Sequence, residues 1–505
     1  TVEVKLENKI DPRLSGAHRQ CYRLKALSKW RAPSSLLAKR YIDETTERGV
    51  YFTDVRMQMT AKSVADCYNL HKPPKPIDMV MAFVLEFINR PDRPLYCVEA
   101  FIDGKFNKHS GNSGFVDEEN MRMTPHALSH FSYALSGGRL LVVDIQGVGD
   151  LYTDPQIHTL NDEGFGVGNL GLEGMALFFK THRCNTICSG IFNLPPFPNA
   201  HAVDQGEEER SVFAERSTPV VSPKGEIVYT PRLVSSVVPR DHNGIALKPT
   251  PTGLIHWQLA RLYARGFAKE HQGAKDPVAA HFHLENAATE GVAAALLQMA
   301  KLYCEIAPSG EDVWGQWMVR NEVLALRHWI AAGRRGCREA AYSAAQILRT
   351  GTDYAPADAA EAVRLLQIVV ASQDDEGEES DDGDAAPEAE ESESFEASTP
   401  VEVASPGPMR RGSDEAPPHT LFKGASEETN ELHRLHGLKW AVQVDKQLLQ
   451  GDEPGVERHV AIAQLAQLLA QGGDGLARDA AKAAEWFREA ADEAMATGKG
   501  KLFMQ

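Results

Sequence analysis

One helical pattern recurs through the second half of the chain, and it limits the possible folds more than any other feature of the sequence. Each unit combines a helix of small residues, a turn and an aromatic helix that closes on Ala-Ala, as in His283–Gly291 and Trp329–Gly333. A single helix pair leaves its apolar stripe uncovered, so neighbouring pairs must stack on one another. The pattern therefore predicts an all-α solenoid that begins near Leu254. Further copies lie at Leu259–Tyr263, Met299–Tyr303, Leu465–Leu469 and Trp486–Ala491.

Changes of composition divide the chain into five segments. The linker we expect is rich in Ser, Thr, Pro, Glu and Arg without helical or strand periodicity, which exposes its hydroxyl groups to phosphorylation. The proline run Leu194–Pro198 stops regular structure and ends the first domain. The segments are a mixed α+β domain (residues 1–198), the linker (199–250), helical repeats (251–372), a disordered acidic and Pro-rich insert (373–430) and further helical repeats (431–505).

Charge and cysteine content exclude several classes of function. The net charge is −17, but 13 acidic residues lie between Asp374 and Glu396, which leaves −4 for the rest of the chain. We therefore expect no direct binding of nucleic acid. Seven cysteines without a repeating framework favour a reducing compartment, and no apolar run approaches the roughly 18 residues of a membrane span. With no signal peptide and no initiator Met, the sequence predicts part of a longer cytoplasmic protein.

The first domain alternates short β-branched runs with helical stretches, which predicts a single α+β unit. The predicted strands are Leu36–Ile42, Met79–Phe87, Leu95–Ile102 and Leu140–Val143, and the predicted helices are Ser63–Leu70 and Met175–Cys188.

Three oxygen-bearing side chains follow the last of these strands. Asp144 comes directly after Leu140–Val143, with Gln146 and Asp154 close behind. A carboxylate at a strand end can bind Mg²⁺ or take a proton from a hydroxyl group, and Mg²⁺ needs only one or two protein carboxylates beside phosphate and water. Polar residues after strands more often just cap turns, so both interpretations remain open at this point.

A lysine and a glycine-rich loop add possible phosphate ligands. Lys39 lies inside an apolar strand, where its ammonium group either reaches solvent or neutralises phosphate. Gly164–Gly171 contains G-x-G-x-x-G but follows a polar stretch instead of a strand, which argues against a dinucleotide-binding unit. Its backbone N–H groups can cradle a phosphate, or the loop is a flexible turn.

Two histidines and two cysteines have the spacing of zinc ligands. His182, Cys184 and Cys188 lie close together in sequence, and His130 supplies a fourth candidate. In a regular helix His182 would point away from Cys184 and Cys188, so the chain must leave helical geometry near His182. The alternative is one scattered histidine with two buried cysteines. A site closed by four ligands is structural and leaves no open position for a zinc hydrolase.

Taken together, these stretches resemble the atypical α-kinases, densely over residues 10–198, and the repeats resemble the Sel1-like class. The resemblance implies an α+β two-lobed atypical protein kinase domain with structural zinc, followed by an all-α Sel1-like repeat solenoid. The stretches that carry the first resemblance are Leu37–Ile42, His71–Lys75, Asn112–Phe115, Val142–His158 and Gly168–Gly171.

The resemblance also implies roles for individual residues in the transfer of the ATP γ-phosphate to a serine or threonine. Asp144 would orient or deprotonate the acceptor hydroxyl, Gln146 and Asp154 would hold Mg²⁺, and Lys39 would contact the nucleotide phosphates. Arg19 would be a second nucleotide contact, and Glu99 would lie where adenine is held between the lobes. The expected contacts of the glycine loop are Gly166, Val167, Gly168, Asn169, Leu170, Gly171 and Leu172, and the expected zinc ligands are His130, His182, Cys184 and Cys188.

Regulation is implied by the same family likeness. Lys75, Arg122 and Thr124 match a pocket for a phosphothreonine of the linker, for which Thr218 is the candidate. The implied substrate is elongation factor 2, and calmodulin is an expected partner. No calmodulin-binding helix is visible, because the basic stretch Arg19–Arg31 aligns with the small lobe. The alternative function is a catalytically weak kinase-like scaffold that gathers partners through its repeats.

Overall fold

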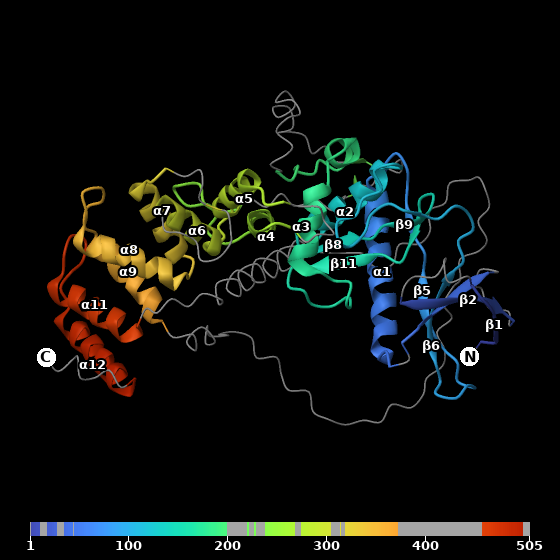
Figure 1. Ribbon diagram of the computed structural model, residues 1–505, viewed down its shortest axis with the longest axis horizontal. Helices are drawn as coiled ribbons and strands as arrows, with labels where there is room; N and C mark the ends of the chain where they lie inside the picture. The colour runs from blue at the N-terminus through green and yellow to red at the C-terminus, as the bar shows by residue number, and fades with distance from the viewer. Residues whose placement is uncertain are drawn as a thin grey trace.

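The computed structural model forms an elongated molecule with strands near one end and helices along the rest (Figure 1). No helix in the part of the chain that it describes is long and apolar enough to cross a membrane. The predictions for Thr218 and for residues 373–430 lie outside the described residues. The structure describes residues 2–10, 18–27, 35–43, 45–198, 220–221, 227–228, 238–267, 274–304, 314, 319–371 and 457–497.

A five-stranded antiparallel sheet forms the first lobe of the amino-terminal domain, in the order β1-β2-β3-β6-β5. The basic stretch after residue 18 is a strand of this sheet instead of a helix, which fits the expectation that it belongs to the small lobe. The strands are β1 (Val4–Lys9), β2 (Arg19–Ala26), β3 (Leu36–Tyr41), β5 (Ala82–Glu86) and β6 (Leu95–Ala100).

The two faces of this sheet have different chemistry because side chains alternate along a strand. Leu36 and Ala38 of β3 pack with Tyr96 and Val98 of β6 in an apolar cluster. The residues between them face the other way, toward helix α1 (Arg48–Leu70). The lone buried lysine of β3 therefore points to the α1 side of the sheet.

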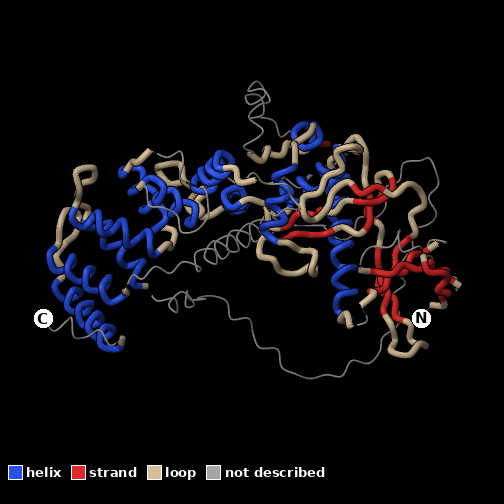
Figure 2. The backbone as a smooth tube through the Cα atoms, in the orientation of Figure 1, coloured by secondary structure: helices blue, strands red, loops and turns tan. Residues whose placement is uncertain are grey.

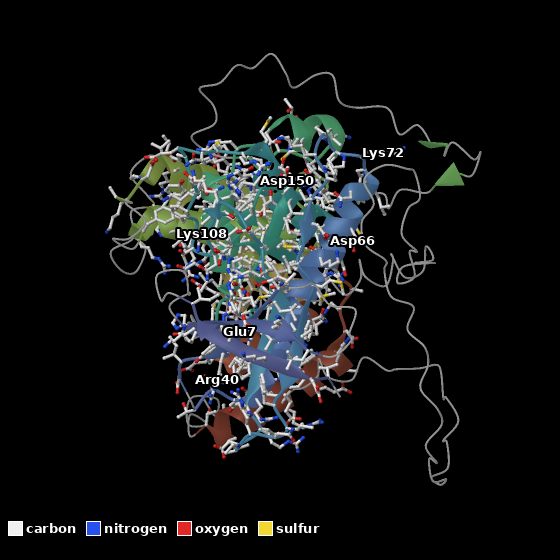
Figure 3. All side chains as sticks on the ribbon, turned by 90° about the vertical axis from the view of Figure 1, so that its right-hand side faces the viewer. Glu7, Arg40, Asp66, Lys72, Lys108 and Asp150 are labelled. Carbon is white, nitrogen blue, oxygen red and sulfur yellow. The ribbon has the colours of Figure 1, made fainter. Side chains whose placement is uncertain are left out.

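The second lobe contains α2 (Met123–Leu135) and α3 (Gly171–Thr181) with two small sheets. Figures 2 and 3 show it beside the first lobe, with Lys108 and Asp150 in the second lobe and Glu7 and Arg40 in the first. Its core packs Tyr68, Phe131, Val142 and Ile157. The remaining elements are β4 (Asp78–Met79), β7 (Asn107–Lys108), β8 (Leu140–Val143), β9 (Gln146–Val148), β10 (Leu151–Thr153), β11 (Gln156–Thr159) and a π-helical turn (Ile187–Ile191).

Three predicted elements need correction. The strand expected over Met79–Phe87 is two strands in different sheets, β4 and β5, because the chain passes from one lobe to the other between them. The helix expected over Ser63–Leu70 is the last third of α1. The helix expected over Met175–Cys188 ends at Thr181, and the chain leaves helical geometry at His182, as the ligand spacing required.

Helices that pack in pairs build the described part of the chain after residue 250, which confirms a helical carboxy-terminal region. Side chains of Thr250, Asp276, Asn321, Asp358 and Asp479 cap helix starts, each by accepting a backbone hydrogen bond. Its first helix packs on α3, so one apolar core continues from the second lobe into the repeats. The helices are α4 (Pro251–Arg265), α5 (Pro277–Thr289), α6 (Ala293–Tyr303), α7 (Glu322–Gly333), α8 (Arg338–Thr350), α9 (Ala359–Val370), α11 (Arg458–Gln471) and α12 (Ala480–Ala496).

The linker also departs from expectation at two points. It contains a short hairpin of β12 (Val220–Val221) and β13 (Ile227–Val228), where the composition indicated no strand. Its last residues are ordered against α5 before α4 begins, because the N–H of Ala246 donates to the Thr289 carbonyl.

Candidate active site

Lys39 is buried on the α1 side of the sheet and forms two ion pairs. Its side chain is 5% exposed, and Nζ lies 2.7 Å from Glu99 Oε1 and 2.6 Å from Asp154 Oδ2. Burial by itself lowers the pKa of Lys39, but the two carboxylates outweigh burial and hold that pKa above its ordinary value. Lys39 therefore stays charged at the centre of the domain, which excludes the interpretation that its ammonium group reaches solvent.

Arg19 joins this lysine to the loop that follows β10. Its guanidinium lies 2.9 Å from Asp154 Oδ1 and 3.2 Å from Asp54 Oδ2. Tyr41 donates a further hydrogen bond to Asp54 over 2.9 Å. Burial would raise the pKa of Asp154, yet Arg19 and Lys39 hold it well below the ordinary range. Asp154 thus stays ionised between two cations.

Helix α1 contributes side chains to the site that the sequence did not indicate. Gln58 is buried and donates to Glu99 Oε2 over 3.1 Å and to the Val80 carbonyl over 2.7 Å, while its Oε1 accepts from the Asp154 backbone N–H. Asp54 and Gln58 lie four residues apart, which puts both on the helix face that covers the sheet. The spacing of these two polar residues on the buried face of the helix could have indicated that they belong to the site.

A small pocket lies where these elements meet. It is lined by side chains of the sheet, of α1 and of the loop after β10, and the charged ones carry both signs. Glu99 uses its side chain for Lys39 and Thr153, so a contact with adenine at this position would fall to the neighbouring backbone. The polar lining residues are Arg19, Lys39, Asp54, Gln58, Glu99 and Asp154.

Asp144 lies on a second branch of the same network. Gln146 Nε2 donates to Asp144 Oδ2 over 3.2 Å and to the Asp154 carbonyl over 3.1 Å, so one amide links the two aspartates. Lys108 of β7 lies 2.6 Å from Asp144 Oδ1, a partner that no sequence motif indicated. Burial raises the pKa of Asp144 although Lys108 opposes it. Both aspartates have left-handed backbone conformations, with φ of 56° and 49°.

The glycine loop flanks the pocket without lining it. Gly166 lies beside Thr53 of α1, and Asn112 donates to the Gly168 carbonyl over 3.2 Å. Four backbone N–H groups expected to face a nucleotide, those of residues 169–172, are already bonded to protein acceptors. These N–H groups close the loop and the start of α3, which leaves residues 166–168 for outside contacts.

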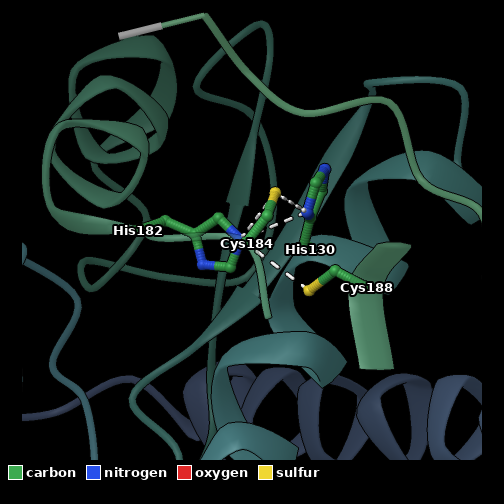
Figure 4. Close-up of side chains that lie close together, drawn as sticks. All are labelled: His130, His182, Cys184 and Cys188. Carbon is green, nitrogen blue, oxygen red and sulfur yellow. Dashed lines mark hydrogen bonds between the residues drawn. The ribbon is translucent and has the colours of Figure 1, made fainter. Parts of the chain in front are cut away.

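The four expected zinc ligands converge in the second lobe (Figure 4). Their donor atoms all lie within 4.8 Å of one another. His182 Nε2 is 3.2 Å from His130 Nδ1, 3.7 Å from Cys184 Sγ and 3.9 Å from Cys188 Sγ. Zinc at usual bond lengths gives tetrahedral edges of about 3.3 to 3.8 Å, so this donor set fits the ion.

One of the three residues expected to hold a phosphothreonine, Arg122, contacts Asp150. Arg122 donates to the Gly149 carbonyl over 2.6 Å and pairs with the Asp150 carboxylate. Thr124 is buried at the start of α2, and Lys75 is an exposed residue shortly before β4, which runs beside β10. The structure thus brings Arg122 and Thr124 together at the start of α2, where the Asp150 carboxylate already pairs with Arg122.

Comparison with known proteins identifies the family of the amino-terminal domain. A sequence profile of the Alpha-kinase family matches residues 14–188. Eukaryotic elongation factor 2 kinase of Homo sapiens is 51% identical over 201 residues, which cover 39% of this chain and 27% of that protein. The Caenorhabditis elegans protein of the same name is 51% identical over 203 residues, covering 38% of this chain and 26% of that protein. The match thus spans about a quarter of the length of these relatives.

More distant relatives carry other names. Myosin heavy chain kinase B of Dictyostelium discoideum is 48% identical over 178 residues, covering 35% of this chain and 24% of that protein. A crystal structure of the alpha-kinase domain of myosin heavy chain kinase A in complex with ADP is 36% identical, covers 39% of this chain and 89% of that structure, and has a TM-score of 0.35. On the profile and the sequence identities, residues 14–188 of this chain form a protein kinase domain of the alpha-kinase family.

Proposed function

We propose that this chain is a serine/threonine protein kinase that transfers the γ-phosphate of ATP to a threonine of elongation factor 2 and thereby slows translation elongation. The observation that carries the proposal is the buried Lys39, paired with Glu99 and Asp154 beside a pocket. The identity of about 50% to elongation factor 2 kinases supports the substrate. We also propose a cytoplasmic location, because seven cysteines without a repeating framework favour a reducing compartment.

The cations would provide most of the binding energy for the nucleotide. Phosphoryl transfer depends mainly on positioning and on neutralising charge at the phosphate oxygens. Lys39 and Arg19 now balance Asp154 and Asp54, so their charge is preorganised at the pocket. An entering triphosphate would share these cations with the carboxylates. The Gln146 amide oxygen and Asp154 would hold Mg²⁺, which would supply further positive charge for the phosphate when bound.

Asp144 would act on the acceptor hydroxyl. Its raised pKa makes the carboxylate a better proton acceptor than an exposed aspartate. Lys108 and Gln146 hold its two oxygens in place, which fixes the direction from which a hydroxyl can approach. The carboxylate is thus a positioned base at one end of a network whose other end is Lys39.

The zinc cluster and the helical region would have structural and regulatory roles. Zinc on His130, His182, Cys184 and Cys188 would tie α2 to the segment after α3, since all four positions are filled by protein. The helices after residue 251 would be Sel1-like repeats that present the substrate. Lys75, Arg122 and Thr124 would hold phosphorylated Thr218, which would displace Asp150 from Arg122. Calmodulin remains an expected regulator from the family.

Transfer of radiolabelled phosphate from ATP to purified elongation factor 2, with and without calcium–calmodulin, tests the proposal. We expect labelled threonine with the natural chain and a loss of about 10³-fold or more with Asp144→Ala. Asp117→Asn is the matched control, because Asp117 carboxylate contacts the exposed Asn120 in the same lobe. ATP binding without transfer to any protein substrate would instead indicate a kinase-like scaffold.

A further inference from the structure

The glycine loop has an exposed tip whose conformation depends on side chains at the base of the loop. It joins β11 to α3, and Val167 at its tip is fully exposed. Gly164, Gly166 and Gly171 have positive φ, a conformation that side chains rarely adopt. The backbone of such a loop is held in one conformation only if its base is anchored, and three side chains at the base do this.

Asn169 closes the loop on itself. Its Oδ1 accepts from the N–H groups of Thr159 and Gly171, both over 3.0 Å. Its Nδ2 donates to Thr159 Oγ1 over 2.7 Å and to the Gly164 carbonyl over 3.1 Å. Asp162 Oδ1 also accepts from the Leu172 N–H. These bonds set the internal shape of the loop but do not fix where it lies relative to the rest of the site.

His158 provides that external anchor. Its side chain is fully buried, its Nδ1 accepts from the Leu170 N–H over 3.0 Å, and its Nε2 contacts the Asn112 carbonyl over 2.7 Å. A nitrogen that accepts from an N–H carries no proton, so Nε2 must be the donor and the ring must be neutral. Burial lowers the pKa of His158 to about 4, which keeps this tautomer at neutral pH.

The histidine connects the loop to the segment that reaches Asp144. Asn112 follows β7 by four residues, and Lys108 of β7 pairs with Asp144. Asn112 also donates from its side chain to the Gly168 carbonyl. On the other side, a Cβ at Gly174 would lie 2.5 Å from the imidazole, so α3 packs directly on the ring. The imidazole of His158, which extends from β11, thus contacts the end of the loop, α3 and the Lys108 segment.

We infer that His158 is a positioning residue that fixes the glycine loop against the Lys108 segment and thereby sets the affinity of the site for ATP. The inference deepens the proposed function and rests on it. His158 does not reach the pocket, so it acts through residues 166–168 of the loop. Without its two hydrogen bonds the loop is held to the Lys108 segment by the Asn112–Gly168 hydrogen bond, and a nucleotide would have to order the loop base on binding.

Two substitutions separate the two hydrogen bonds. In His158→Asn the Oδ1 atom replaces Nδ1 and still accepts from Leu170, whereas in His158→Gln the Nε2 atom replaces the ring Nε2 and still reaches Asn112. We expect His158→Ala to weaken ATP binding about tenfold, with His158→Asn and His158→Gln each recovering part of the loss. KM for ATP should rise with the dissociation constant, while kcat and KM for the protein substrate change little.

Binding of ATP, measured by isothermal titration calorimetry on the full chain, separates this inference from the proposed function. If the natural chain binds ATP and phosphorylates its substrate while His158→Ala binds ATP with unchanged affinity, the positioning role is refuted. An increase confined to KM for the protein substrate would refute it as well. Asn69→Ala is the matched control, because Asn69 also clamps one segment by two hydrogen bonds, to the Ile77 N–H and carbonyl, away from the loop. It should lower stability without changing ATP affinity.

Discussion

The kinase domain and the helical repeats bury different kinds of side chain. Around the pocket, Lys39 and Glu99 are each 4% exposed and carry opposite charges. In the helical region the buried residues are mostly apolar and many are alanine: helix α8 buries five side chains, of which four are alanine. Glu361 is buried there, but its arginine partners Arg334 and Arg364 extend toward solvent.

This difference indicates which region carries out chemistry and which region sets the shape of the molecule. A buried ion pair costs desolvation and seldom adds net stability, so a buried charge network beside a pocket marks a functional site. Alanine surfaces let helices approach closely and set the path of a solenoid without any chemistry of their own. A substitution of Lys39 should therefore reduce activity far more than the same substitution in the helical region. The following experiments test that contrast.

The largest effect is expected at the proposed zinc site formed by His130, His182, Cys184 and Cys188. Cys188→Ser removes a ligand from a closed four-ligand site, and the second lobe should lose most of its stability because structural zinc contributes to folding directly. Metal analysis should find about one zinc per natural chain and close to none in the variant. Cys67→Ser, a half-buried cysteine of α1, is the control and should keep both zinc and fold. A natural chain without zinc that resists chelators would contradict the assignment.

The next largest effect is expected at Lys39. Lys39→Met removes a preorganised cation from the proposed phosphate site, leaves the buried Glu99 without a cation and leaves Asp154 with Arg19, so kcat/KM should fall about 10²- to 10³-fold. The same change at Lys301 in the repeats, whose pair with Glu339 is partly exposed, should leave activity unchanged and cost less than about 1 kcal/mol. Equal losses of activity from Lys39→Met and Lys301→Met would mean that a buried charge does not identify the active site.

The sequence indicated this contrast only in part. The apolar run Leu36–Ile42 and the ligand spacing around His182 predicted the strand with Lys39 and the break after α3, because each follows from local geometry. Lys108 and Gln58 were missed because their partners lie 36 and 96 residues away, and only the folded chain brings them together. The break between β4 and β5 was missed for the same reason, since two strands of different sheets read as one apolar run.

A moderate effect is expected from pH, because the glycine loop is held by a neutral histidine. The folded-state pKa of His158 is about 4, below its ordinary value of 6.5, so the unfolded chain binds more protons between these values. The stability linked to His158 is complete above pH 6.5 and is lost as the pH falls toward 4, at most about 3 kcal/mol. Urea unfolding should show a shallower pH dependence in His158→Asn than in the natural chain, and identical slopes would contradict this.

The smallest effect is expected where α7 packs closely on α8 and α9. A Cβ at Gly333, the last residue of α7, would lie 2.8 Å from the Ala341 Cα of α8 and 3.0 Å from Leu365 of α9. Gly333→Ala should therefore push these helices apart and destabilise the repeats by about 1 to 3 kcal/mol. Gly49→Ala in α1 meets no atom within 4 Å and should be neutral or slightly stabilising, because alanine favours a helix over glycine. If the helical region sets shape and the charged site sets chemistry, Gly333→Ala and Gly49→Ala will differ in thermal unfolding but have equal affinity for ATP. A weaker affinity in Gly333→Ala would show that the packing of α7 to α9 affects the pocket through α4 and α3.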